Sequence, residues 1–195
     1  MMSGDYLATR LKNETQVLHV AVEQELGLPD SIRTREEYAA FLSRLLKFHQ
    51  TFEANIESAK WSSDWINVEI APAEHVRSDL IQDDLLKLGA EIDFRRVNIF
   101  EYPTFAQALG GLYVVEGSSL GGRVIAPILN RHLKSIPTRF FESDGRNHPQ
   151  PWRSVKSALA RAELLGMNSE EIIQGAAVTF ENFGQYLTAS RWQLS

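Results

Sequence analysis

The sequence predicts a single all-α domain that spans residues 1–195 and contains about six to eight helices. Apolar residues recur at intervals of three and four positions along most of the chain, which is the period of an amphipathic helix. No segment alternates apolar and polar residues for long enough to predict a strand. At 195 residues, 44% of them hydrophobic, the chain is long enough to bury a core of its own.

The first two predicted helices have clear apolar stripes. The first covers about residues 4–26, and the second begins at the sequence Thr34-Arg-Glu-Glu37. A threonine followed three residues later by a glutamate is a capping box, which marks the start of a helix. The two stripes consist of Leu7, Leu11, Val17, Leu18, Val22 and Leu26, and of Tyr38, Phe41, Leu45, Phe48 and Phe52.

The rest of the chain predicts four more helices separated by loops. Helical periodicity returns at about residues 76–88, 104–132, 152–165 and 169–187. Residues 61–72 have no clear period, which indicates a loop with a short irregular element. Residues 136–151 contain three prolines together with aspartate, glycine and asparagine, so they are also predicted as a loop.

The composition argues against several classes of function. The formal net charge is −5 and the basic residues are scattered, whereas nucleic-acid-binding proteins usually concentrate them in a stripe. The absence of cysteine excludes disulfides, thiolate metal sites and a thiol nucleophile. No apolar run is long enough for a secretion signal or a membrane span. We therefore expect a cytoplasmic protein that binds neither nucleic acid nor a membrane.

The segment 104–132 is unusual because it contains five glycines, at positions 110, 111, 117, 121 and 122. Each glycine in a helix interior costs about 1 kcal/mol relative to alanine. Gly110, Gly117 and Gly121 are separated by seven and four residues, so they share one face of the helix. Small residues can serve close helix packing, or they can leave a helix face open for a flat ligand. For five glycines in one helix we favour the ligand.

Three residues of the first helix form a second candidate site. Lys12, His19 and Glu23 are separated by seven and four residues and therefore lie on one face. A neutral imidazole is a common iron ligand, and an acceptor such as Glu23 usually orients its other ring nitrogen. The pair His49 and Glu53 repeats the same spacing. The pattern therefore does not by itself identify a metal ligand.

Taken together, the two segments resemble a known family. An early helix with the pattern K-x6-H-x3-E is followed by a helix with G-x-Y-V-x-E-G-S-x-x-G-G. This order resembles the haem oxygenases, and specifically the bacterial branch that makes biliverdin for bacteriophytochromes. The stretches 139–145 and 151–153 and the helix with Phe180 and Phe183 also resemble that branch, so the similarity covers nearly the whole chain.

The resemblance implies a site for haem b on the first helix. It makes His19 the proximal iron ligand and Glu23 the residue that orients it. It also implies that Lys12 and Tyr113 meet the haem propionates.

The resemblance places the glycine helix on the opposite, distal side of the haem. Gly117 and Gly121 would line this side and leave room for bound O2, and Phe180 and Phe183 would wall the pocket. Well-known members have an aspartate here that organises water. The aligned residue in this chain is Ser118, and Glu116 points about 200° away from Ser118 on a helix.

The function that the resemblance implies is oxidative cleavage of haem, as both cofactor and substrate, to biliverdin, carbon monoxide and iron. The sequence shows no flavin or nicotinamide motif, so an external donor such as a ferredoxin or a reductase would supply the electrons. A bacteriophytochrome would be a candidate recipient of the biliverdin.

Two alternatives remain open at this point. A haem carrier or sensor without turnover would share every residue named above. A non-haem di-iron oxidase could take its ligands from His19/Glu23 and His49/Glu53, although the usual E-x-x-H pairs are missing. A thiaminase-like enzyme of the same fold would need a cysteine nucleophile, which the chain lacks.

Other polar residues carry less information. We expect His75 and His132 to be exposed, because they lie near predicted loops or helix ends. We expect Asp83 and Asp84 to form a solvated face of their helix.

Overall fold

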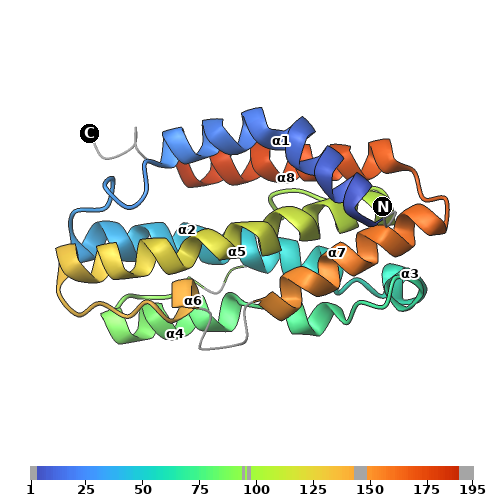
Figure 1. Ribbon diagram of the computed structural model, residues 1–195. Helices are drawn as coiled ribbons and strands as arrows, with labels where there is room; N and C mark the ends of the chain where they lie inside the picture. Colours follow the sequence, from blue (N-terminus) through green and yellow to red (C-terminus); the bar gives the residue numbers. More distant parts are fainter. Residues whose placement is uncertain (1–3, 94, 96–97, 143–148, 189–195) are drawn as a thin grey trace.

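The computed structural model describes residues 4–93, 95, 98–142 and 149–188, and their regular secondary structure is entirely helical (Figure 1). In chain order the helices are α1 (Gly4–Leu26), α2 (Arg35–Ile56), the 3₁₀ helix η1 (Ala59–Trp61), α3 (Ser62–Asn67), η2 (Pro72–His75), α4 (Ser78–Leu88), α5 (Phe105–Leu133), α6 (Arg139–Glu142), α7 (Pro149–Leu164) and α8 (Ser169–Thr188). This confirms the all-α prediction. Within the described ranges, no helix is long and apolar enough to cross a membrane.

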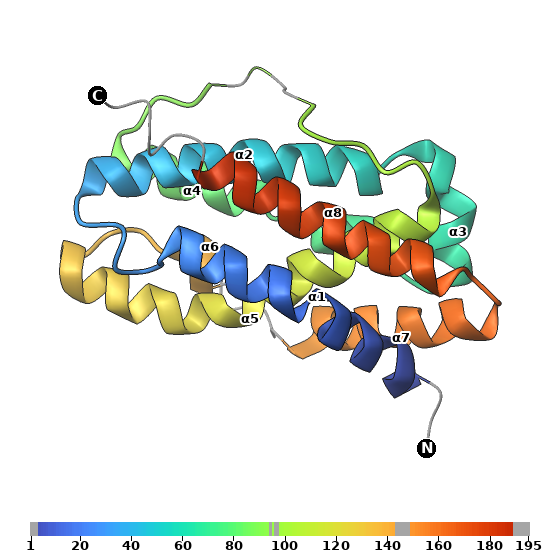
Figure 2. The same ribbon diagram turned by 90° about the horizontal axis from the view of Figure 1, so that it is seen from above.

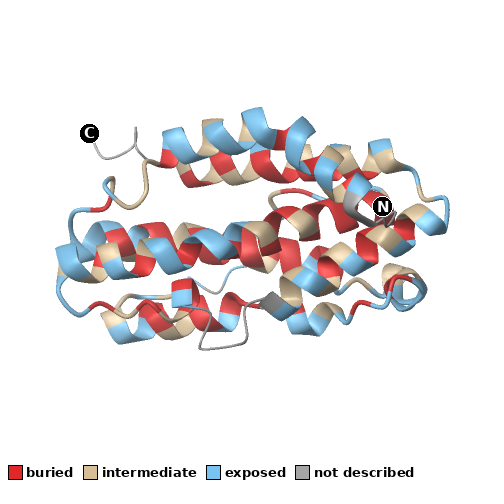
Figure 3. Cartoon of the chain, in the orientation of Figure 1, coloured by how far each residue is buried: buried red, intermediate tan, exposed pale blue. Residues whose placement is uncertain are grey.

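The helices form layers, with α1 and α8 side by side above α2 and α5 (Figures 1 and 2). Helix α8 packs against both α1 and α5, whereas α4 lies beneath α2 and contacts α6. Buried residues line the inward face of each helix, as the apolar stripes predict (Figure 3). Side chains of α1, α2, α5 and α8 line a common cavity in this arrangement.

Local sequence signals account for several helix ends. The capping box at α2 is confirmed, because Glu37 N donates to Thr34 Oγ1 and Thr34 N donates to Glu37 Oε2, both at 3.1 Å. Thr104 also caps its helix, α5, since its hydroxyl accepts from Gln107 N. Helix α4 ends at Gly89, whose φ of 72° is a left-handed conformation that glycine adopts without strain.

Both segments predicted as loops contain a short helix, although the sequence indicated a short irregular element only in the first. Helix α3 lies in the segment 61–72, and α6 lies in the segment 136–151, of which residues 143–148 are outside the described ranges. Asp84 explains α6, because its carboxylate accepts hydrogen bonds from the backbone N–H groups of Arg139 and Phe140 at 3.0 and 2.9 Å. The prediction that Asp84 belongs to a solvated face is therefore wrong, since it is fully buried.

Close packing of α5 against α8 requires glycine on both helices. A Cβ atom at Gly110 would overlap the carbonyl oxygen of Ile172, and one at Gly175 would overlap the carbonyl oxygen of Gln107. Both obstacles are backbone atoms, so neither can move aside as a side chain could. Gly110 and Gly175 therefore let the two backbones approach each other directly.

We predict that Gly175→Ala lowers the free energy of unfolding by about 1–3 kcal/mol, because the added methyl group forces α5 and α8 apart. Gly121→Ala is the matched control, since a Cβ at this helical position meets nothing within 4 Å. The control should keep or slightly raise stability, because alanine favours the helix. Urea unfolding of both variants measures the difference, and equal stabilities would contradict the packing account.

Candidate functional site

An apolar cavity of about 580 Å³ lies between α1, α2 and α5 and is closed by α6 and α8. This volume is within the range of about 300–1,000 Å³ that small-molecule sites usually have. Its apolar walls come mainly from Val22, Leu26, Leu45, Phe48, Val114, Val115, Phe140, Phe141, Phe180 and Phe183. Few polar side chains reach it, so each of them is a candidate for a specific role.

The cavity brings together most of the residues that the sequence nominated. The seven are His19 and Glu23 from α1, Gly117, Ser118 and Gly121 from α5, and Phe180 and Phe183 from α8. These residues come from distant parts of the chain, and their meeting depends on how α1, α5 and α8 pack. Their individual roles stay predictions.

His19 enters the cavity from α1 with one ring nitrogen directed to an acceptor. Its Nδ1 lies 3.5 Å from Glu23 Oε2, one helical turn away. Its ring meets that of Phe180 edge-to-face, with centroids 5.7 Å apart. About half of the His19 side chain remains exposed. Glu23 can therefore orient Nδ1 while Nε2 is available to a metal ion.

The glycines of α5 fall into two groups with different surroundings. A Cβ at Gly111 would overlap the hydroxyl group of Tyr102, and one at Gly122 would lie 2.7 Å from Phe141 O, so packing requires both, as it does Gly110. A Cβ at Gly117 would only reach ordinary contact with Trp152 at 3.5 Å, and one at Gly121 would meet nothing within 4 Å. Packing within the chain does not explain Gly117 and Gly121, and both line the cavity.

Two other nominated residues lie outside the cavity, and the hydroxyl group of Ser118 is turned to its own helix. Lys12 is exposed on α1 and Tyr113 packs its ring against Trp152 at 5.2 Å, and neither residue lines the cavity. Ser118 does line it, but its hydroxyl donates to Val115 O within the same helix at 2.8 Å. Because Lys12 and Tyr113 do not line the cavity, their contact with the haem propionates stays a prediction.

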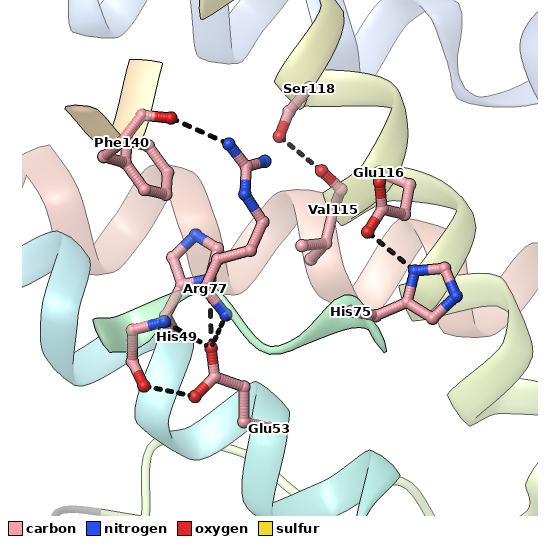
Figure 4. Close-up of polar contacts among 9 residues, drawn as sticks. His49, Glu53, His75, Arg77, Val115, Glu116, Ser118 and Phe140 are labelled. Atoms are coloured by element: carbon pink, nitrogen blue, oxygen red, sulfur yellow. Dashed lines mark hydrogen bonds and ion pairs between the residues drawn. The ribbon is translucent and has the colours of Figure 1, made fainter. Parts of the chain in front are cut away.

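His49 is a cavity residue that the sequence indicated only as a repeat of the His19 spacing and as a ligand of the di-iron alternative. It is 3% exposed and lines the cavity from α2, between the aromatic rings of Phe48 and Phe140. Arg77 lies beside it, with Nη2 donating to Phe140 O at 2.8 Å and the guanidinium over the Phe140 ring (Figure 4). The period of α2 places His49 next to the Phe48 stripe, which was the available signal for its burial.

Glu53 links α2 to the start of α4. Its Oε1 accepts the backbone N–H groups of Arg77 and Ser78, both at 2.8 Å, and its Oε2 accepts the Ser78 hydroxyl. Burial acts to raise the pKa of Glu53, but His49, the Ser78 hydroxyl and the Arg77 amide outweigh it and lower the pKa. The carboxylate is therefore an anionic cap of α4.

This role of Glu53 counts against the di-iron alternative. Both of its oxygens already accept hydrogen bonds from the start of α4. In the part of the chain that the structure describes, no three His, Asp or Glu side chains are grouped closely enough to hold a metal ion. An imidazole presented to an apolar cavity without such a group suits an iron that brings its own equatorial ligands, as haem does.

The prediction that His75 is exposed is wrong, because the structure buries it. Its Nδ1 lies 2.7 Å from Oε1 of Glu116, and both side chains are inaccessible to solvent (Figure 4). The pair joins η2 to α5 at the residue before Gly117. The two residues are 41 positions apart, so no local pattern could indicate the contact.

A family model described as "Heme oxygenase" matches residues 5–189 of the chain. The chain belongs to the haem oxygenase family. It is 28% identical over 153 residues to a "Heme oxygenase" of Xanthomonas campestris pv. campestris (strain 8004), which covers 75% of this chain and 88% of the relative. These matches agree with the family that the His19 and glycine motifs resemble.

A solved haem oxygenase has the same fold. The NO- and CO-bound heme oxygenase from Neisseria meningitidis superimposes with a TM-score of 0.69, covering 94% of this chain and 91% of that chain at 24% identity. At this identity the similarity establishes the fold. The roles of individual residues in this chain therefore depend on the geometry of its own cavity.

We predict that Glu53→Gln weakens the acid sensitivity of folding. Because the folded pKa of Glu53 is lower than its ordinary value of 4.5, its carboxylate contributes stability above that pH and loses it as pH falls. The free energy of unfolding of the wild type should therefore decrease more steeply between about pH 5 and pH 3 than that of the variant. Urea unfolding at several pH values measures both slopes, and the exposed Glu101→Gln is the control. Equal slopes for Glu53→Gln and wild type would contradict the assignment.

Proposed function

We propose that this chain opens haem b oxidatively, with His19 as the iron ligand and the Gly117–Gly121 face of α5 against the opposite side of the ring. The observation that carries the proposal is that Gly117 and Gly121 line the cavity without any packing contact that requires glycine. His19 and Glu23 approach the same cavity from another helix. A flat ligand fits between an imidazole and a helix face without side chains.

The chain's own residues bind and orient the substrate. His19 Nε2 would bind the iron while Glu23 holds Nδ1 and fixes the plane of the imidazole ring. Phe180 and Phe183 enclose the cavity with apolar surface that limits the entry of water. Haem, when bound, supplies the O2 chemistry that cleaves its own ring, and the family's products are biliverdin, carbon monoxide and iron.

The electrons must come from a separate protein in this proposal. The sequence shows no flavin or nicotinamide motif that could supply them within the chain. A ferredoxin or a reductase is therefore the proposed donor. The motifs in the two site helices also support the biliverdin-producing branch, so a bacteriophytochrome is a proposed recipient of the product.

We predict that His19→Ala loses the histidine-ligated Soret spectrum that the wild type forms with about one equivalent of haemin. Adding ascorbate or a ferredoxin–reductase system in air should convert the wild-type complex to biliverdin. His132→Ala is the matched control, because this histidine is exposed on α5 and does not line the cavity. The control should retain both spectrum and conversion.

Three results would change this assignment. An unaltered spectrum in His19→Ala would show that another residue binds the iron. Stable haem binding without conversion would favour a carrier or sensor over an enzyme. Absence of haem binding by the wild type would contradict the proposed function as a whole.

A further inference from the structure

Residues 116–125 of α5 run along the cavity and form a weak segment of helix. Three of the ten residues are glycines, and each glycine costs about 1 kcal/mol relative to alanine. The buried residues of this stretch are Glu116, Ser119 and Gly122, so no apolar side chain in it is fully buried. Hydrophobic packing therefore does less here than elsewhere in α5 to fix the position of the helix.

Glu116 is the long buried side chain of this stretch, and it reaches another element of the fold. Its Oε1 lies 2.7 Å from Nδ1 of His75 in η2, and the two residues are 3% and 1% exposed (Figure 4). An ionised carboxylate only accepts hydrogen bonds, so Nδ1 of His75 donates. The contact attaches α5 to η2 directly before Gly117.

His75 belongs to a segment that α2 holds in place. Two residues further on, the backbone N–H of Arg77 donates to Oε1 of Glu53 at 2.8 Å, and the N–H of Ser78 does the same at 2.8 Å. Glu53 is part of α2, so η2 cannot slide along α2 without breaking these two bonds. The contact between His75 and Glu116 therefore fixes the glycine stretch of α5 relative to α2.

Stability alone does not explain why this pair is polar. Replacing a buried ion pair by apolar residues of similar volume is often neutral or stabilising. A hydrogen bond, in contrast, has a narrow range of lengths and angles. The pair is therefore suited to hold η2 and α5 at one separation.

We propose that His75 and Glu116 are positioning residues that hold the turn of α5 beginning at Gly117 at one distance from the haem, and so limit the size of the molecule that binds the iron on that side. The proposal rests on the proposed function, because it assumes that haem occupies the cavity. Gly117 follows Glu116 directly and lines the cavity. Loss of the contact lets the weak glycine stretch move away from the haem, and larger ligands then fit.

The binding of methyl and tert-butyl isocyanide to the ferrous haem complex tests this proposal. The ratio of the two dissociation constants measures how strongly the site excludes the larger ligand. In the double variant His75→Leu/Glu116→Leu, urea unfolding should show a stability close to that of the wild type, because the new pair is apolar. The discrimination against tert-butyl isocyanide should nevertheless fall about tenfold, as loss of one hydrogen bond to a charged group predicts. Unchanged discrimination in this variant would overturn the proposal.

Glu116→Gln tests whether the hydrogen bond itself holds the helix. The amide oxygen of glutamine can still accept from Nδ1 of His75, so this variant should keep the wild-type ratio. A loss as large as that of the double variant would contradict the proposal.

Tyr102→Phe is the matched control for loss of a buried hydrogen bond. It removes the 2.7 Å contact between the hydroxyl groups of Tyr102 and Thr179, neither of which lines the cavity. This variant should lose stability and keep the wild-type ratio of isocyanide affinities. A ratio that falls here as well would attribute the effect to general destabilisation and contradict the proposal.

The ligand-free protein provides a test that does not depend on haem. Amide hydrogen exchange of residues 117–122 should be faster in the double variant than in the wild type, whereas exchange in α8 should not change. In the wild type itself, imidazole ¹⁵N chemical shifts should show a proton on Nδ1 of His75. Equal exchange, or a proton on Nε2 alone, would overturn the proposal. If the wild type binds no haem, the proposed function fails, and these measurements still determine whether the pair holds α5.

Discussion

The direct contact between the backbones of α5 and α8 determines the position of the site. Gly110 and Gly175 allow this contact, because side chains at either position would overlap backbone carbonyl oxygens. With α5 fixed against α8, and α1 packed on α8, the Gly117–Gly121 face of α5 lines the same cavity as His19 and Glu23 of α1. The glycines of one helix thus serve two purposes, since some bring the helices together and others keep the cavity open.

Polar contacts between distant residues hold the other side of the cavity. His75 binds Glu116 beside Gly117, Glu53 caps α4, and Asp84 caps α6. Buried ionised groups are costly unless they are paired or hydrogen-bonded. These contacts fix the segment around Arg77 and the aromatic ring of Phe140, which form the inner wall next to His49.

The sequence predicted the helices well wherever the signal was local. The capping box at Thr34, the apolar stripes and the glycine-rich helix all describe residues within a few positions of each other. The structure confirms them except for Val17 of the first stripe, which is 79% exposed. The sequence missed α6 and the burial of Asp84 and His75, because their partners are 41 to 56 residues away. A contact that arises only when helices pack leaves no periodic pattern in the sequence.

Part of the site was predictable because some of its residues are neighbours on a single helix. His19 with Glu23, and Gly117 with Gly121, are neighbours on their own helices, so spacing alone placed each pair on one face. Spacing could not separate Gly117 and Gly121 from Gly110, which shares their face but packs against α8. It also could not show that Lys12 and Tyr113 do not line the cavity, while His49 does. Those distinctions depend on which helices cross, and where.

Haemin titration of Gly121→Leu shows whether Gly121 is small so that a ligand can lie against α5. A leucine here meets no atom of the chain near its Cβ and favours the helix, so urea unfolding should show stability at least equal to that of the wild type. The dissociation constant for haemin should rise by about tenfold or more, which corresponds to about 1.4 kcal/mol. Unchanged haemin affinity in a stably folded Gly121→Leu would contradict the account.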